Sequence, residues 1–241
     1  MNAQLPLALR WPAQQRFASF VAGDNAIVLE LLRAAAQSAG SPWVFVAGPR
    51  GCGRTHLLLA ACAAASEAGR GAQYLPLKSL LESSSPSKRM DVDVALRALG
   101  GSDVLALDDV DSIAGDARAE HALFDLYNRC KVDKSTMLFA AVAAPAQCGF
   151  ALPDLVSRFS ACAQAPLKPL ADADRRDALR QRASSRGLTL DDAVLDWLFA
   201  RTQRDLGSLT ALLDRMDRES LATQRRITVP FLRKLLDEQP P

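Results

Sequence analysis

The chain has 241 residues, of which 49% are hydrophobic, so it can bury one substantial core and a smaller packing unit. Its 29 Lys and Arg residues nearly balance 27 Asp and Glu residues, and the net charge of +2 excludes a protein that coats nucleic acid by charge alone. No apolar run approaches the roughly 20 residues of a membrane-spanning helix, and the five cysteines form no C-x-x-C pair. We therefore expect a cytoplasmic globular protein with reduced thiols.

Residues 1–15 contain two prolines and are predicted to form an extended N-terminal tail. Within it, Gln4, Leu5 and Leu7 belong to a run of alternating apolar residues that has no partner element nearby in the sequence. This pattern makes the tail a candidate peptide ligand for a partner protein. The alternative is a terminus that is solvated or loosely docked.

A turn at residues 23–25 is predicted to open a helix that extends to Ala36, and the apolar run 43–47 is typical of a buried strand. That strand leads into a glycine-rich loop and then into an Ala/Leu-rich helix, the order of a phosphate-binding loop. Its backbone N–H groups would turn inward onto a phosphate, aided by the helix dipole. The candidate nucleotide-binding residues are Gly48, Pro49, Gly51, Cys52, Gly53, Arg54, Thr55 and His56. The alternative is a glycine turn that merely joins strand to helix.

Two residues of this loop have specific predicted roles. The Thr55 hydroxyl sits where a phosphate loop contacts Mg²⁺. Arg54 replaces the usual lysine, so the cation is kept but a planar fork stands in place of a compact point charge. Binding of a nucleoside diphosphate can survive this change, whereas γ-phosphate positioning for efficient hydrolysis is weakened.

Residues 72–77 are predicted to form a second strand, followed by a polar loop at 82–88 and a helix at 92–99. The run from Val104 then ends in Asp108 and Asp109, so both carboxylates would emerge at the carboxyl end of a buried parallel strand beside the phosphate loop. We expect Asp108 to hold Mg²⁺ through water and Asp109 to orient an attacking water. An ordinary strand end is the alternative.

Residues 116–131 and 152–159 are predicted helices that flank a strand at 136–142, and the second helix carries Arg158. Strands that alternate with helices predict an α/β fold with a parallel sheet covered on both faces. After Pro166 and Pro169 no further strand is visible, and helices are predicted at 172–186, 191–201, 204–222 and 228–238. We expect a tail (1–15), a phosphate-loop α/β domain (16–168) and a small helical lid domain (169–241).

These elements together resemble the AAA+ ATPases, and particular stretches resemble the DnaA replication initiator family within them. Those stretches are Phe17 to Asn25, the Asp108-Asp109 ending and Phe124 to Arg129. Other segments resemble the short Hda-type members, regulatory inactivators of DnaA that lack its DNA-binding domain. They are Gly51 to Leu58 with its arginine, Asp217 to Phe231, and Gln4-Leu5-Pro6-Leu7, which is similar to that group's motif for the DNA polymerase sliding clamp.

The chain departs from this family at two positions that would contact its own nucleotide. The family's polar sensor residue after the fourth strand is replaced by Ala143, within Ala141 to Pro145. The lid helix has Gly207 where the family has a second sensor arginine. The resemblance therefore implies negligible intrinsic hydrolysis, and it favours bound ADP over ATP, with Mg²⁺.

Arg158, in contrast, keeps the position of the family's trans-acting arginine, although an ordinary surface ion pair is the alternative. The resemblance implies a regulator that is bound to the DNA-loaded clamp and promotes ATP hydrolysis on DnaA, with no sequence-specific DNA contact and no membrane. Two alternatives stay open. One is a stand-alone ATPase of this family, and the other is a degenerate scaffold that acts only by binding partners. Asp109 is a candidate catalytic residue in addition to Arg158, and the sequence is also compatible with a homo-oligomer.

Overall fold

The computed structural model describes residues 11–82, 92–201, 209, 212–217, 219 and 227–237, and the side chains only as far as residue 233. Gln4, Leu5, Leu7 and Gly207 lie outside the described residues, as does most of the helix predicted at 204–222. The described residues fall into two compact units. One contains residues 11–20, 27–47 and 54–166, and the other contains residues 21–26, 48–53 and those from 167 onward.

The first unit is built on a five-stranded parallel sheet with the strand order β2-β3-β4-β1-β5. Its strands are β1 (Val44–Ala47), β2 (Ala72–Pro76), β3 (Val104–Asp108), β4 (Thr136–Ala141) and β5 (Ala163–Pro166). The predicted α/β class with a parallel sheet is confirmed. β5 was not predicted, because the strand is short and its four residues, Ala-Gln-Ala-Pro, form no apolar run.

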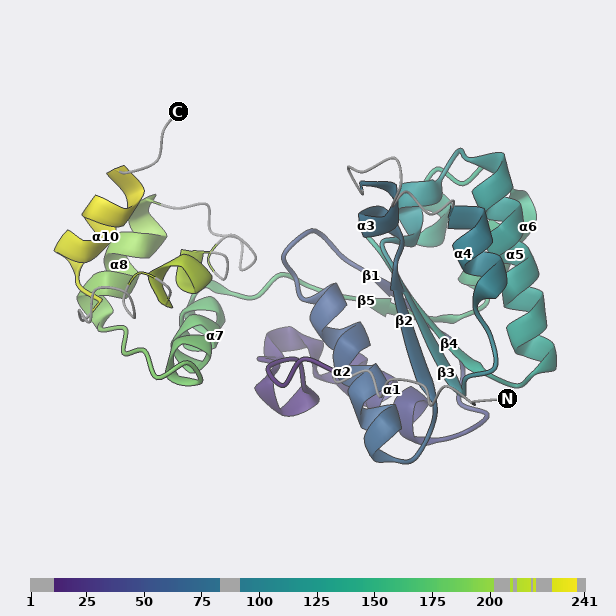
Figure 1. Ribbon diagram of the computed structural model, residues 1–241, viewed down its shortest axis with the longest axis horizontal. Helices are drawn as coiled ribbons and strands as arrows, with labels where there is room; N and C mark the ends of the chain where they lie inside the picture. The colour runs from purple at the N-terminus through teal and green to yellow at the C-terminus, as the bar shows by residue number, and fades with distance from the viewer. Residues whose placement is uncertain are drawn as a thin grey trace, which may run out of the picture. The chain divides into compact units, whose positions relative to one another are not determined.

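Helices cover both faces of this sheet, with α1 and α2 on one face and α4, α5 and α6 on the other (Figure 1). The helices of this unit are α1 (Ala26–Gln37), α2 (Arg54–Glu67), α3 (Leu77–Leu81), α4 (Val92–Ala98), α5 (Ala117–Val132) and α6 (Pro153–Ser160). Short 3-10 turns are η1 (Phe17–Ser19), η2 (Gly23–Asn25), η3 (Val110–Ile113) and η4 (Pro145–Gln147). α3 was not predicted, and it begins at Leu77, where the second strand was predicted to end.

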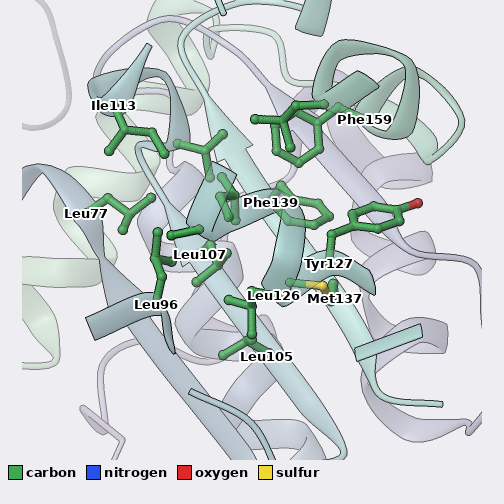
Figure 2. Close-up of a cluster of buried hydrophobic side chains, with 14 of the residues drawn as sticks. Leu77, Leu96, Leu105, Leu107, Ile113, Leu126, Tyr127, Met137, Phe139 and Phe159 are labelled. Atoms are coloured by element: carbon green, nitrogen blue, oxygen red, sulfur yellow. The ribbon is translucent and has the colours of Figure 1, made fainter. Parts of the chain in front are cut away.

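The main core lies between the sheet and the helices α4, α5 and α6, which cover one of its faces. Side chains alternate across a strand, so the odd-numbered positions of β3 and β4 point to this face. Figure 2 shows the resulting cluster, in which Leu105, Leu107, Met137 and Phe139 meet Leu126 and other helix residues. All four strand residues are at most 1% exposed, which fixes the register of the sheet.

The C-terminal residues are helical, as predicted. Here α7 (Asp172–Ser184), α8 (Asp192–Arg201) and α10 (Val229–Asp237) contribute to a separate apolar cluster that includes Leu179, Leu195, Leu198 and Leu232. None of the helices in the described ranges has both the length and the apolar character needed to cross a membrane. No disulfide joins the five cysteines.

Candidate nucleotide site

The glycine-rich loop connects the carboxyl end of β1 to α2, which begins at Arg54. Gly51 and Gly53 have φ angles of 78° and 98°, a region that favours glycine. A Cβ atom added at Gly48 would lie 2.7 Å from the Leu167 carbonyl oxygen, so only glycine fits there. Because α2 starts at residue 54, its first N–H groups have no partners within the helix and can serve an anion.

Thr55 and Asp108, the two residues predicted to contact Mg²⁺, contact each other directly. The Thr55 hydroxyl donates to Asp108 Oδ2 over 2.6 Å, and the Tyr74 hydroxyl donates to the same oxygen over 2.9 Å. The backbone N–H of Asp109 donates to Asp108 Oδ1. Burial and the neighbouring Asp108 carboxylate raise the pKa of Tyr74, so this hydroxyl stays a donor. Asp108, which is 2% exposed, is therefore held by three donors.

Sequence reasoning missed Tyr74. It lies on β2, whose parallel pairing with β3 places Pro76 opposite Asp108 and so brings the end of β2 beside the acidic pair. Only the order of strands in the sheet could have revealed this contact, and the sequence pattern does not contain that order.

Arg54 and Asp109 form an ion pair across the site, with Arg54 Nη2 lying 3.1 Å from Asp109 Oδ1. The Arg54 side chain is 8% exposed, and its Nη1 has no hydrogen-bond partner among the described residues. Asp109 has φ 51° and ψ 47°, a left-handed conformation that is unusual for a residue other than glycine. Burial, followed by the Asp108 charge, raises the pKa of Asp109, and the Arg54 charge opposes this rise.

The residues present fit a magnesium-bound nucleoside phosphate. A threonine hydroxyl and a carboxylate are oxygen donors of the kind that Mg²⁺ prefers, and Mg²⁺ takes its other ligands from water and phosphate. No cluster of three or more His, Cys, Asp or Glu side chains that could hold a metal ion occurs in the described ranges. The unpartnered Nη1 of Arg54 offers an N–H to an anion.

The side chain of His56 contacts other parts of the chain and is not directed to a phosphate. Its Nε2 lies 2.9 Å from the Arg16 carbonyl oxygen, and its ring packs edge-on against Phe20 at a centroid distance of 5.3 Å. Any contribution of this residue to phosphate binding would come from its backbone, in the first turn of α2.

The four residues that follow β4, at positions 142–145, have apolar side chains. Ala141 is buried at the strand end, and the Val142 N–H donates to Asp111 Oδ1 over 3.2 Å. The Cys148 thiol donates to the Ala143 carbonyl oxygen over 3.3 Å. A sensor contact from this segment would need a polar residue where the chain has alanine.

Arg158 lies on α6, is exposed, and has no ion pair among the residues that the structure describes. Its Cζ is 5.9 Å from the centroid of the Tyr127 ring, and Tyr127 packs edge-on against Trp43. Trp43 directly precedes β1, and its carbonyl accepts from Ala163 at the start of β5. Arg158 thus lies near the amino ends of the strands, whereas Thr55 and Asp108 lie at their carboxyl ends.

A parallel sheet of this order, with a glycine-rich loop after β1 and an acidic pair at the end of β3, defines a phosphate-loop domain, which the DnaA family model places in the AAA+ class. Residues 12–165 match the model of the bacterial DnaA ATPase domain, and residues 172–236 match that of the Hda lid domain. The chain belongs to the DnaA family, and its lid is of the Hda type.

Solved structures agree on the fold. Domain III of DnaA from Thermotoga maritima is 19% identical, with a TM-score of 0.77 over 95% of this chain and 98% of that chain. AMPPCP-bound DnaA from Aquifex aeolicus is 21% identical, with a TM-score of 0.65 over 89% of this chain and 69% of that chain. The RuvB Holliday junction branch migration motor of Thermotoga maritima is 20% identical, with a TM-score of 0.60 over 89% and 67%.

Proposed function

We propose that this chain is a regulatory AAA+ protein that promotes hydrolysis of ATP on the initiator DnaA and so prevents re-initiation of chromosome replication. In this proposal it acts in the cytoplasm, with Gln4, Leu5 and Leu7 of its tail bound to the DNA-loaded sliding clamp. The match of its lid to Hda supports the regulatory role.

The observation that carries the proposal is the placement of Arg158. The side chain is exposed near the amino ends of the strands, whereas the chain's own Thr55 and Asp108 lie at the carboxyl ends. Arg158 is therefore better placed to reach a nucleotide on a neighbouring molecule than one bound to its own chain. A guanidinium supplied in trans to the γ-phosphate stabilises the charge that develops during phosphoryl transfer, which is worth about 10³–10⁵ in rate. Its planar fork can contact two phosphate oxygens together.

The chain's own site supports binding better than turnover. Arg54 is engaged by Asp109, and an alanine replaces the first sensor. The loop amides serve the α and β phosphates, so ADP with Mg²⁺ is the proposed ligand. Solved DnaA proteins carry AMPPCP, which supports an adenine nucleotide in this fold.

The test is ATP hydrolysis by DnaA in a reconstituted assay that contains DNA-loaded clamp. We expect Arg158→Ala and Arg158→Lys to fold and to bind the clamp, yet to lose stimulation by at least about 100-fold. Arg33→Ala is a matched control, because Arg33 also lies over an aromatic ring, that of Phe17, at 5.4 Å. Full stimulation by Arg158→Ala would show that the cation comes from elsewhere or that the chain acts only as a scaffold.

The stand-alone ATPase is the remaining alternative, and the same preparation tests it. Steady-state phosphate release by the purified chain, abolished in Asp109→Asn, would favour that alternative. Negligible release is the expected result, because the groups that would position the γ-phosphate are replaced or paired elsewhere.

A further inference from the structure

The helix that carries Arg158 begins without a capping side chain of its own. Leu152 occupies the N-cap position of α6 and makes no side-chain hydrogen bond to the helix. Leu155, at the third helical position, also has no side-chain acceptor for the Leu152 N–H, so the backbone N–H groups just before the helix need partners from another element.

Glu120 of α5 supplies those partners. Its Oε2 accepts from the Leu152 N–H over 2.7 Å, and its Oε1 accepts from Ala151 over 3.0 Å and from Gly115 over 2.7 Å. Glu120 is 0% exposed. A buried carboxylate is costly unless hydrogen bonds compensate it, and both of its oxygens are used here on backbone N–H groups.

The contact lies at the amino end of α6, the helix that carries Arg158. Leu155 and Phe159 point into the core, where Phe159 packs 4.7 Å from the Phe139 ring (Figure 2). Arg158, between them in sequence, is directed outward over Tyr127. Arg158 is six positions after Leu152, a rise of about 9 Å along a helix, so a tilt at the anchored end moves the guanidinium.

We propose that Glu120 is a positioning residue for Arg158: it fixes the start of α6 so that the guanidinium is presented in one orientation to a neighbouring molecule. This inference rests on the proposed function, because it assigns a role in the delivery of Arg158. Misplacement by about 1 Å at a catalytic group can cost about 100-fold in rate.

The principal test is Glu120→Gln, which keeps the shape of the side chain but turns one acceptor oxygen into an NH₂ group that faces a backbone donor. We expect the maximal rate of DnaA-bound ATP hydrolysis to fall by about 10-fold or more. The concentration of the variant that gives half-maximal stimulation should stay within about twofold of that of the unsubstituted chain, because positioning affects the reaction and not the binding to DnaA. Hydrogen exchange of residues 155–160 should accelerate, while that of β3 and β4 stays unchanged.

Leu32→Ala is the control for a general loss of stability. Leu32 is fully buried on α1, which covers the opposite face of the sheet from α6 (Figure 1). An equal loss of maximal rate in Leu32→Ala would reduce Glu120 to a structural residue. If Glu120→Gln does not fold, Glu120→Asp gives the same test with the charge kept and the reach shortened.

Arg158→Ala in the same assay separates the two ideas. If Arg158→Ala loses stimulation while Glu120→Gln keeps the full maximal rate, the positioning role is wrong and the proposed function stands. If Arg158→Ala itself keeps full stimulation, the role assigned to Arg158 in the proposed function is wrong, and the role of Glu120 fails with it.

Discussion

Arg54 and Asp109 show how one substitution changes the use of a neighbouring side chain. The guanidinium reaches Asp109 across 3.1 Å and is 8% exposed, so the pair is shielded from water on the arginine side. In this arrangement the carboxylate that would orient a water is a partner of the loop cation. Breaking such a pair from one side leaves the other charge buried and uncompensated.

The pKa of Asp109 gives a test at this residue. Its pKa is raised above the ordinary value of 3.8 in the folded chain, so the folded state binds this proton more tightly than the unfolded state. The contribution of Asp109 to the free energy of unfolding therefore falls as pH rises through the ordinary pKa and up to the raised one. We expect the stability of Asp109→Asn relative to the unsubstituted chain to increase between pH ~3 and pH ~7.

Urea unfolding of both chains at a series of pH values measures this difference. Only the slope of this difference against pH is diagnostic. The substitution also replaces the ion-pair partner of Arg54, and the effect of that change on the free energy of unfolding does not depend on pH in this range. A flat or declining difference would contradict the assigned direction of the pKa shift.

Single residues were predictable from sequence where chain-local spacing defines them. The pairing of Thr55 with Asp108 follows from a phosphate loop and an acidic strand end, and the structure places the two 2.6 Å apart. Tyr74 and Glu120 were not predictable, since their partners are reached through the strand order and through the packing of α6 on α5. No local pattern marks either contact.

At the level of elements, Arg70 joins parts of the first unit that are distant in sequence. Its Nη1 donates to the carbonyls of Ala35 and Ala36 near the end of α1. Its Nη2 donates to the Asp103 carbonyl, just before β3, and to the Thr136 hydroxyl at the start of β4. One guanidinium thus ties a helix end to two adjacent strands.

We expect Arg70→Met to lower the free energy of unfolding by about 2–4 kcal/mol, because it leaves several carbonyls without their charged donor. Arg70→Lys should recover less than about half of this loss, since a single ammonium cannot reach all four acceptors. Chemical denaturation measures both values. Equal stability of Arg70→Lys and the unsubstituted chain would show that charge alone suffices.

Elements were predictable in proportion to their length and apolar pattern. The long apolar runs of β3 and β4 and the periodic α5 were expected at nearly their observed positions. The four-residue β5 and the five-residue α3 were missed, because neither is long enough to establish a period. β5 forms through its pairing with β1, a long-range contact.

For the whole molecule, the proposed clamp contact is carried by residues that the described structure does not include. We expect Gln4→Ala combined with Leu5→Ala to abolish clamp binding and to change the free energy of unfolding by less than about 0.5 kcal/mol. Surface plasmon resonance on immobilised clamp, together with thermal denaturation, checks both. Binding at the unsubstituted level would rule out the peptide-ligand role, and loss of folding would make the tail structural.

The opposite placement of Arg158 and the Thr55–Asp108 pair also restricts the symmetry of any assembly that brings such parts together. An interface that joins the amino edge of one sheet to the carboxyl edge of the next is heterologous, so no two-fold axis can generate it. If the contacts do not close into a ring, a row of such molecules leaves one arginine side unused at one end and one nucleotide side unused at the other. A chain that exposes Arg158 can give its arginine to a neighbour, but its own site, with Arg54 paired to Asp109, is poorly arranged to receive one. Such a chain would occupy only one end of the row, and the row would have a direction.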